Sequence, residues 1–188
     1  MITYKNILDT DKDVQEQVRL WRNSPRIRSA MLDTSDITPE RHRQWLKSLA
    51  EKTENIVWVA FADNIPFGLI NLRNIDRDAR LCNWGYYVGD DAFLGHKLGL
   101  RLLYDLHDWG FIDKNLDKMH STVRSDNIKA LHDELLAGYH VEGYLKNHLR
   151  STTGELIGLY LIAQFRDEWM KNREKIASWA KNGDEVSC

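Results

Sequence analysis

A change of hydrophobic period near the middle of the chain constrains the fold more than any other feature. Residues 80–88 (RLCNWGYYV) are typical of a strand, whereas the leucines within residues 95–112 recur at helical spacing. Another strand is predicted at residues 117–123. A strand, a helix and a second strand in this order need a parallel crossover, which an all-antiparallel sandwich does not contain. The sequence therefore predicts an α/β fold.

The other predicted elements are arranged around this crossover. Strands at residues 55–62 and 67–75 precede residues 80–88, and the short turns between them indicate an antiparallel meander. The remaining expectations are a strand at 2–7, helices at 11–23, 24–31 and from Thr38-Pro39 onward, a helix at 125–137, strands at 139–149 and 155–163, a helix at 166–180, and a frayed tail at 181–188. These elements predict a mixed seven-stranded sheet flanked by helices.

Charge and cysteine usage exclude several classes of function. The 188 residues include 26 Lys and Arg against 28 Asp and Glu, a net charge of −2, so an overall basic surface for nucleic acid is absent. No apolar run approaches the ~20 residues of a membrane span, and the start MITYKNILDTDKD is too polar for a signal peptide. Cys82 and Cys188 form neither a disulfide framework nor a zinc pattern. We therefore expect a cytoplasmic protein that binds no metal, nucleic acid or membrane.

The loop at residues 89–99 (GDDAFLGHKLG) leads from a strand into a helix and is a candidate anion site. A helix start offers unpaired N–H groups and about half a positive charge, and Gly95 and Gly99 let a bound group approach the backbone. His96, Lys97 and Arg101 add positive side chains beside those amides. The spacing matches neither GxxxxGK[ST] nor GxGxxG. An ordinary strand-to-helix turn is therefore the alternative.

Together, the element order, this loop and residues 125–139 (SDNIKALHDELLAGY) resemble the GNAT superfamily of acetyl-CoA-dependent N-acetyltransferases. The resemblance covers almost all of residues 1–163. It implies a GNAT-type acyl-CoA N-acyltransferase fold for residues 1–163, followed by an extra C-terminal helix and tail at residues 164–188.

The resemblance also implies an acetyl-CoA site. In the family, the loop reads approximately Arg/Gln-x-x-Gly-x-Gly/Ala, which corresponds here to residues 94–99, and Asn127-x-x-Ala130 matches a second motif. Lys97 stands where the family has glycine, so it either contacts a phosphate as a point charge or crowds the pyrophosphate. The residues that the resemblance assigns to acetyl-CoA are Tyr87, Val88, Gly95, His96, Lys97, Leu98, Gly99, Asn127 and Ala130.

Glu134 occupies the position, seven residues after Asn127, where many family members have a tyrosine that protonates the departing thiolate. A thiol has a pKa of about 8.5, so loss of an acid worth roughly 10²–10⁴-fold slows the reaction without abolishing it. Glu134 is a candidate catalytic base, acting directly or through water. The alternative is an exposed carboxylate on a helix.

The N-terminal third narrows the expected acceptor. Its pattern of Trp21-Arg22-Asn23-Ser24-Pro25, Met31 and His42-x-x-Trp45 resembles the acetyltransferases of pseudaminic acid biosynthesis, which acetylate the 4-amino group of a UDP-linked 4-amino-4,6-dideoxy sugar. His42 is the second catalytic candidate, as a base or a ligand, with a surface histidine as the alternative. The expected acceptor-binding residues are Arg22, Asn23, Met31, Trp84 and Tyr86, although aromatic residues at alternate strand positions also suit a core.

Two other readings stay open. Acetyltransferases of ribosomal-protein N-termini share much of the Trp-Arg-Asn pattern, so a protein N-terminal amine is the alternative acceptor. An amine of pKa near 8 needs only about 1.4 kcal/mol for deprotonation at pH 7, which suits either acceptor better than a lysine of pKa about 10.4. Lys97 and Glu134 also leave a non-catalytic acyl-CoA-binding relative as an alternative.

Trp169 and Trp179 predict that the C-terminal helix packs on the core or on a second subunit of a homodimer.

Overall fold

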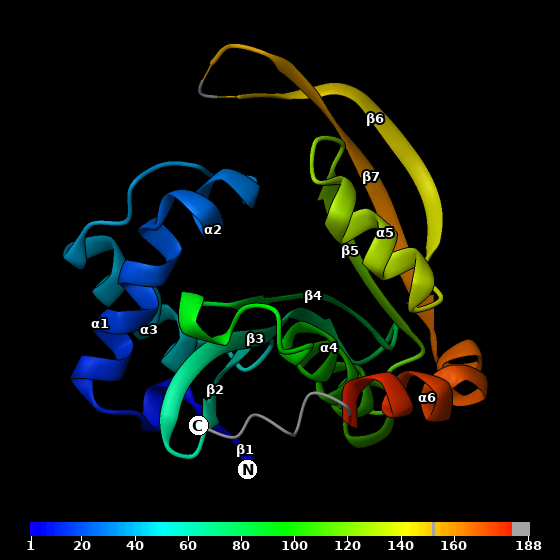
Figure 1. The fold of residues 1–188 in the computed structure, drawn as a ribbon, viewed down its shortest axis with the longest axis horizontal. Coiled ribbons are helices and arrows are strands. Elements are labelled where there is room, and N and C mark those ends of the chain that lie inside the picture. Colours follow the sequence, from blue (N-terminus) through cyan, green and yellow to red (C-terminus); the bar gives the residue numbers. More distant parts are fainter. Residues whose placement is uncertain (152, 182–188) are drawn as a thin grey trace.

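The computed structural model describes residues 1–151 and 153–181 as one seven-stranded sheet with helices on both sides (Figure 1). The strand order is β1-β2-β3-β4-β5-β7-β6. The strands are β1 (Ile2–Asn6), β2 (Ile56–Ala62), β3 (Ile65–Asp76), β4 (Leu81–Val88), β5 (Lys118–Arg124), β6 (His140–Arg150) and β7 (Leu156–Phe165). The helices are α1 (Lys12–Asn23), α2 (Pro25–Ala30), α3 (Pro39–Glu51), α4 (Leu98–Asp108), α5 (Ile128–Leu136) and α6 (Arg166–Lys181).

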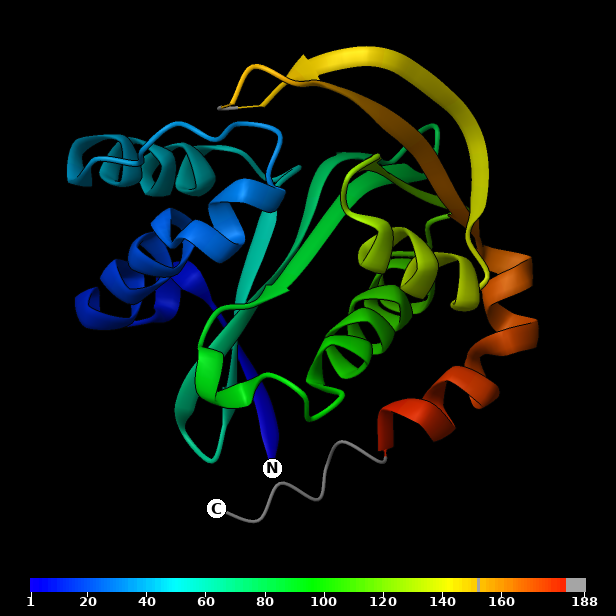
Figure 2. The same cartoon turned by 45° about the horizontal axis from the view of Figure 1, so that its top comes forward.

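The sheet is mixed, as the crossover predicted. Strands β2, β3 and β4 form the expected antiparallel meander, β4 pairs with β5 in parallel, and β5 pairs with β7 antiparallel. The long β6–β7 ribbon arches over the sheet beyond β5, and α1–α3 lie across the meander from α4 (Figure 2). The predicted fold class and the additional C-terminal helix are therefore confirmed.

Local sequence signals account for the first three helices. The side chain of Asp11 accepts a hydrogen bond from Val14 N at 2.9 Å and begins α1. Ser24 and Thr38 cap α2 and α3, and each is followed by proline at the first helical position. Proline suits this position because its fixed φ is helical and its missing N–H would have no partner there.

Helix α4 starts later than the sequence pattern indicates. The prediction placed its start near Gly95, but Gly95 has φ +85° and Lys97 has φ +56°, so the first helical residue is Leu98. Left-handed backbone at two nearby residues interrupts a right-handed helix. At its other end the chain continues as a π-helical turn at Trp109–Asp113.

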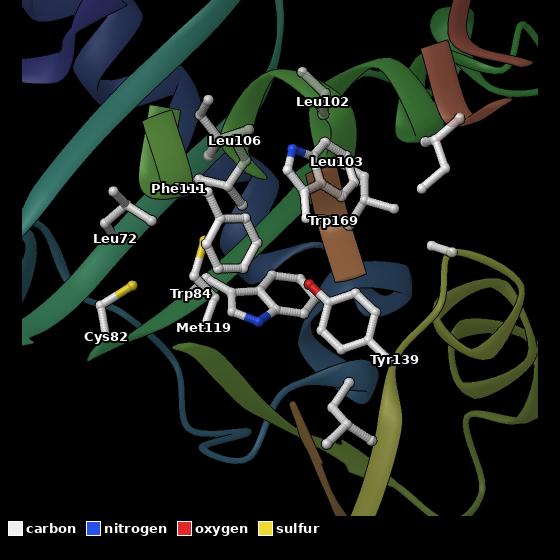
Figure 3. Packing of buried hydrophobic residues seen from close by; sticks show 14 of the residues in the cluster. Leu72, Cys82, Trp84, Leu102, Leu103, Leu106, Phe111, Met119, Tyr139 and Trp169 are labelled. Atoms are coloured by element: carbon white, nitrogen blue, oxygen red, sulfur yellow. The ribbon is translucent and has the colours of Figure 1, made fainter. Parts of the chain in front are cut away.

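Alternation along the strands produces a core on each side of the sheet. Val57, Val59 and Phe61 of β2 pack with α1–α3, while the intervening residues of β2 face the core beneath α4. Figure 3 shows Trp84, Phe111, Met119 and Tyr139 packed together in this second core. Side chains that point to opposite faces thus allow both helical layers to bury apolar surface on one sheet.

Helix α6 contributes to the same core as α4. Trp169 is fully buried and its indole N–H donates to Asp108 Oδ1 at 2.9 Å, while Trp179 packs at the core's edge. The expectation that this helix packs on the core is met. Of the predicted tail at 181–188, Lys181 is the last residue of α6, and residues 182–188 lie outside the described residues. Within those residues, no helix has both the length and the apolar character needed to cross a membrane.

Candidate active site

Strands β4 and β5 separate soon after they pair, and this opening is the candidate site. Their parallel ladder joins only Leu81–Asn83 to Lys118–His120 in the described chain. Ser121 Oγ then donates to the carbonyl oxygen of Trp84 at 3.1 Å, which closes the narrow end of the opening. Beyond this point β4 continues to Val88 and β5 to Arg124 with no ladder between them.

The backbone of β4 presents polar groups to the opening. The carbonyl of Trp84 points toward β5, whereas that of Tyr87 lies on the β3 side, 2.8 Å from where a Cβ on Gly68 would be. Because the N–H and C=O groups of alternate strand residues point the same way, those of Tyr86 and Val88 face the opening. Arg26 of α2 donates to the carbonyls of Val88 and Gly89 at 3.0 Å.

At the wide end of the opening, the loop before α4 is exposed and rich in free amides. His96 and Lys97 are exposed, while Leu98 is buried and anchors the helix start. The first intrahelical donors are Leu100 and Arg101, which bond to Lys97 O, so the amides of Leu98 and Gly99 have no helical partner. These amides and the two exposed basic side chains are the kinds of group with which proteins bind anions.

Two glycines and one arginine complete the description of this loop. A Cβ on Gly99 would lie 3.7 Å from the ring of Tyr86, so the helix start borders the β4 aromatic residue. Gly95 adopts the left-handed conformation that favours glycine. Arg101, one of the basic residues noted in the sequence, forms an ion pair with Asp105 at 2.6 Å.

Helix α5 places Glu134 beside the opening. Asn127 caps this helix by accepting from Ala130 N at 3.3 Å, so the second motif forms the helix start. One turn further along, Glu134 is 4% exposed; its Oε1 lies 3.5 Å from the Tyr86 hydroxyl, and its Oε2 has no hydrogen-bond partner. Burial raises the pKa of Glu134 to about 8, and the neighbouring carboxylate of Asp133 adds to this shift. The exposed-carboxylate alternative is wrong, and the carboxyl group is protonated near neutral pH.

Trp84 lies in the core and Tyr86 at the opening, although the sequence suggested both as acceptor contacts. The Trp84 ring packs 5.9 Å from Tyr86 and 5.2 Å from Tyr139, between centroids, and its side chain is 4% exposed (Figure 3). Tyr86 is only partly buried and contacts Glu134. Both face α4 and α5, so they lie on the opposite face of β4 from Tyr87.

On that opposite face, Arg22 and Asn23 hold the chain between α2 and α3. Arg22 donates to Asp33 O at 2.6 Å through Nη2, while its Nη1 is buried without a partner. Asn23 donates to Ile37 O and accepts from Ile37 N, both at 2.9 Å, so each of its amide atoms has a backbone partner. The carbonyl of Met31 accepts from the buried Arg124 of β5 at 3.2 Å. These contacts bring the predicted acceptor residues Arg22 and Met31 to one side of the sheet.

His42 lies apart from these groups, in the contact between α1 and α3. It is 6% exposed, its ring centroid is 5.2 Å from that of Trp45, and its Nε2 has no hydrogen-bond partner. The charged groups that act on it are Glu16 and Arg19 of α1, and burial lowers its pKa. The structure therefore brings Glu134 and Tyr86 together but gives His42 a helix-packing position.

Residues that the sequence did not single out form a polar row across β3, β4 and β5. Arg73 is paired with Asn83, and Asn83 with His120. Asn83 Nδ2 lies 3.2 Å from His120 Nδ1, and the exposed Arg73 reaches Trp84 O at 3.4 Å. In the sequence, the alternating positions of residues 80–88 could have indicated this row, because Asn83, Gly85 and Tyr87 lie on one face of the strand.

The geometry is that of a split sheet with a helix start at one end that carries unpaired amides and exposed basic side chains. Residues 7–132 match the family described as the acetyltransferase (GNAT) domain. The chain belongs to this GNAT family. It is therefore an acetyltransferase that transfers acetyl groups to amines, and the non-catalytic alternative is not retained.

GNAT relatives of two kinds are similar to this chain. The acetyltransferase PseH of Campylobacter jejuni is 27% identical over 131 residues, which cover 70% of this chain and 80% of the relative. A crystal structure of that protein with acetyl coenzyme A aligns with a TM-score of 0.66 at 19% identity, covering 88% of this chain and 99% of that one. The spermidine N-acetyltransferase of Vibrio cholerae, in complex with CoA and spermine, aligns with a TM-score of 0.80 at 16% identity, covering 90% and 98%.

Among the described residues of this GNAT chain, no group of three or more His, Cys, Asp or Glu side chains is arranged to hold a metal ion. Cys82 is buried, and burial raises the pKa of its thiol to about 12. The titratable side chains beside the opening include Glu134 and Tyr86 on one face and His120 on the other.

Proposed function

We propose that this acetyltransferase transfers the acetyl group of acetyl-CoA to the 4-amino group of a UDP-linked 4-amino-4,6-dideoxy sugar. The observation that carries the proposal is the charge of the sheet face that bears Tyr87. The alternate positions of β3, β4 and β5 on this face hold Arg73, Lys118, His120 and Arg124 against one carboxylate, Asp76, which pairs with Leu81 at the end of β3. A nucleotide diphosphate is a polyanion that such a face attracts.

Two guanidinium groups on this side are available to an anionic ligand. In the described part of the chain, neither Arg22 nor Arg73 has a carboxylate within ion-pair distance, and Arg22 Nη1 is buried without a partner. Arginine suits the geometry of phosphate oxygens because its planar donors bind two of them at once. A polyamine is polycationic and is repelled by the same groups, so likeness in fold to spermidine acetyltransferases does not favour that acceptor.

Acetyl-CoA fits the other side of the opening. The amides of Leu98 and Gly99, with His96 and Lys97, would hold its pyrophosphate. The Tyr86 and Val88 amides on the open edge of β4 would bind the thioester arm and polarise its carbonyl. Asn127 and Ala130 border this side through the start of α5. The co-substrate supplies an activated acetyl group with a thiol as the leaving group.

Glu134 acts as the acid in the proposed reaction. The acceptor amine attacks the thioester carbon, the C–S bond breaks, and the sulfur takes a proton from the Glu134 carboxyl. Glu134 then recovers a proton from the acetylated nitrogen. Because burial keeps this carboxyl protonated near neutral pH, its starting state is that of an acid.

A thiol-release assay with matched acceptors tests the proposal. We expect turnover with a UDP-4-amino-4,6-dideoxy sugar, little with a peptide bearing a free N-terminus, and none with spermidine. Calorimetric titration with acetyl-CoA tests the co-substrate site separately. Turnover of only the peptide or only spermidine would overturn the acceptor, and absence of acetyl-CoA binding would overturn the site.

A further inference from the structure

His120 lies at the narrow end of the opening, on the face that carries the cationic groups. It is the last β5 residue paired with β4, and the next residue, Ser121, bonds Trp84 O where the strands begin to separate. Its side chain is partly exposed, and strand alternation places it on the face opposite Ser121. A ligand that reaches the opening from the Tyr87 side therefore meets His120 next to the closed end.

A chain of three side chains orients the imidazole. Asn74 Nδ2 lies 2.9 Å from Asn83 Oδ1, and the other amide atom of Asn83 lies 3.2 Å from His120 Nδ1 and 3.5 Å from His120 Nε2. When both amides are turned, the same contacts run in the other direction, and Asn83 Oδ1 accepts from Nδ1–H. In that arrangement Nε2 carries no hydrogen, and its lone pair can accept a proton because the Asn83 oxygen facing the ring is not a donor. The Asn74 and Asn83 side chains can therefore hydrogen-bond to His120 whether its ring is neutral or protonated.

Burial and the neighbouring Lys118 lower the pKa of His120 and so favour its neutral form. Burial lowers the pKa of the ring, Lys118 on the same strand lowers it further, and Glu142 of β6 opposes them. Glu142 is held by Lys118 at 2.6 Å, and the guanidinium of Arg73 lies in the same row from β3. The facing β7 position is Ala163, which carries no charge. A neutral imidazole with a free nitrogen is a proton acceptor.

We infer that His120 is the general base that removes a proton from the acceptor ammonium group. The acceptor amine is mostly protonated in solution, so it enters the site as an ammonium group. One of its protons passes to His120 Nε2 and from there to water. The freed nitrogen pair then forms the bond to the acetyl carbon. The second proton of the nitrogen goes through Glu134 to the sulfur, so the ammonium and thioester become an amide, a thiol and one released proton. This inference rests on the proposed acetyl transfer.

The proposed acid, Glu134, and the proposed base, His120, lie on opposite faces of β4. Glu134 contacts Tyr86 on the α4 and α5 side, whereas His120 contacts Asn83 on the other side. Glu134 is protonated near neutral pH and cannot also accept the first proton. His42, the histidine that the sequence suggested, packs between α1 and α3.

The pH dependence of His120→Gln tests this role. At pH 7 we expect kcat/KM to fall about tenfold, and at pH 9.5 to recover to within about twofold of wild type, because an amine of pKa near 8 then loses its proton unaided. Asn83→Asp adds a carboxylate beside the ring and should move the acidic limb of the kcat/KM profile up by about one pH unit. His132→Gln, an exposed position on α5, is the matched control and should leave the profile unchanged.

Each outcome decides between a base and a structural residue. A loss in His120→Gln that is equal at every pH, or no loss at pH 7, would overturn the inference. Acetyl-CoA affinity measured by calorimetry shows that the variant keeps its fold and its co-substrate site. If wild type acetylates the peptide instead of the nucleotide sugar, the acceptor proposal fails, and the same pH series on the peptide still tests His120.

Discussion

The hydroxyl of Tyr86 donates a hydrogen bond of 3.5 Å to Oε1 of Glu134, joining β4 to α5 beside the opening. This bond lowers the pKa of Glu134, whereas burial and Asp133 raise it, so the carboxyl titrates near pH 8 instead of near 4.5. The contact connects a strand residue to a helix residue 48 positions later in the chain. Burial thus determines most of the pH range in which the proposed acid is protonated, and the hydrogen bond from Tyr86 opposes it.

The first prediction concerns that pH range. Wild-type kcat should fall above about pH 8, where Glu134 loses its proton. Glu134→Gln has no proton to give and should lower kcat by about 10²-fold and remove this basic limb. Tyr86→Phe should move the limb to higher pH and Asp133→Asn to lower pH, because each removes one of the opposing influences. Steady-state kcat is measured from pH 6 to 10 for the wild type and the three variants. An unchanged pH profile of kcat in Glu134→Gln would exclude the acid role.

The second prediction concerns stability and the buried pair of His107 and Tyr139. His107 Nδ1 donates to Leu103 O at 2.6 Å, so its Nε2 accepts from the Tyr139 hydroxyl. Tyr139→Phe removes the hydroxyl and leaves this nitrogen unpaired, and should cost about 1–3 kcal/mol of unfolding free energy. His107→Leu with Tyr139→Phe should recover part of that loss in urea unfolding. Equal stability of Tyr139→Phe and wild type would contradict the pairing.

His107 also makes stability depend on acid, which forms a third prediction. Burial lowers its pKa to about 4 from 6.5. Between these values the unfolded state binds more protons than the folded state, so the unfolding free energy falls as the pH drops from 6.5 to 4. The loss attributable to this group is about 3 kcal/mol. Urea unfolding across this window should show a smaller loss in the double variant, whereas an identical slope would assign the effect to other groups.

A fourth prediction separates the two roles left open for Lys97. Its φ of +56° strains a residue with a Cβ, so Lys97→Gly should raise the unfolding free energy by about 1 kcal/mol. If the ammonium group contacts a phosphate, the same change should weaken acetyl-CoA binding about two- to fivefold, and high salt should abolish the difference. Calorimetry at two salt concentrations measures this. Tighter binding by the glycine variant would show instead that the lysine crowds the site.

The fifth prediction tests which side of the opening receives the acceptor. A Cβ on Gly85 would lie 3.4 Å from the Asn71 amide, an ordinary contact, so Gly85→Ala should fold normally. The added methyl group occupies the face that carries Arg73 and His120. We expect the acceptor KM to rise several-fold, about 1 kcal/mol, while acetyl-CoA affinity stays unchanged. A change in acetyl-CoA affinity alone would place the acceptor on the other face.

Local patterns in the sequence were sufficient for elements whose causes are local. Ser24-Pro25 and Thr38-Pro39 begin helices because capping and a fixed φ act within one turn. The start of α4 was misplaced because apolar spacing continues through the loop, whereas the left-handed Lys97 that ends this loop has no sequence signature. A non-glycine residue in that conformation is set by its surroundings.

The candidate site was only partly predictable. Glu134 was found by its distance from Asn127 along one helix, yet its pKa is raised by its burial in the folded chain, which the helix sequence alone does not determine. Asn23 was suggested as an acceptor contact, but its amide binds the Ile37 backbone 14 residues away. His120 carried no signal, because only the register of β5 against β4 brings it to Asn83.

The sequence by itself determined the order of strands and helices, the parallel crossover and the loop with its glycines and basic residues. These follow from periodicity, capping and turn chemistry, which act over a few neighbouring residues. Only the tertiary structure decided where β4 and β5 separate, which face each side chain occupies and which titratable groups meet there. Those properties depend on strand register and burial, and a residue's pKa and partners are set by groups that are distant in the chain.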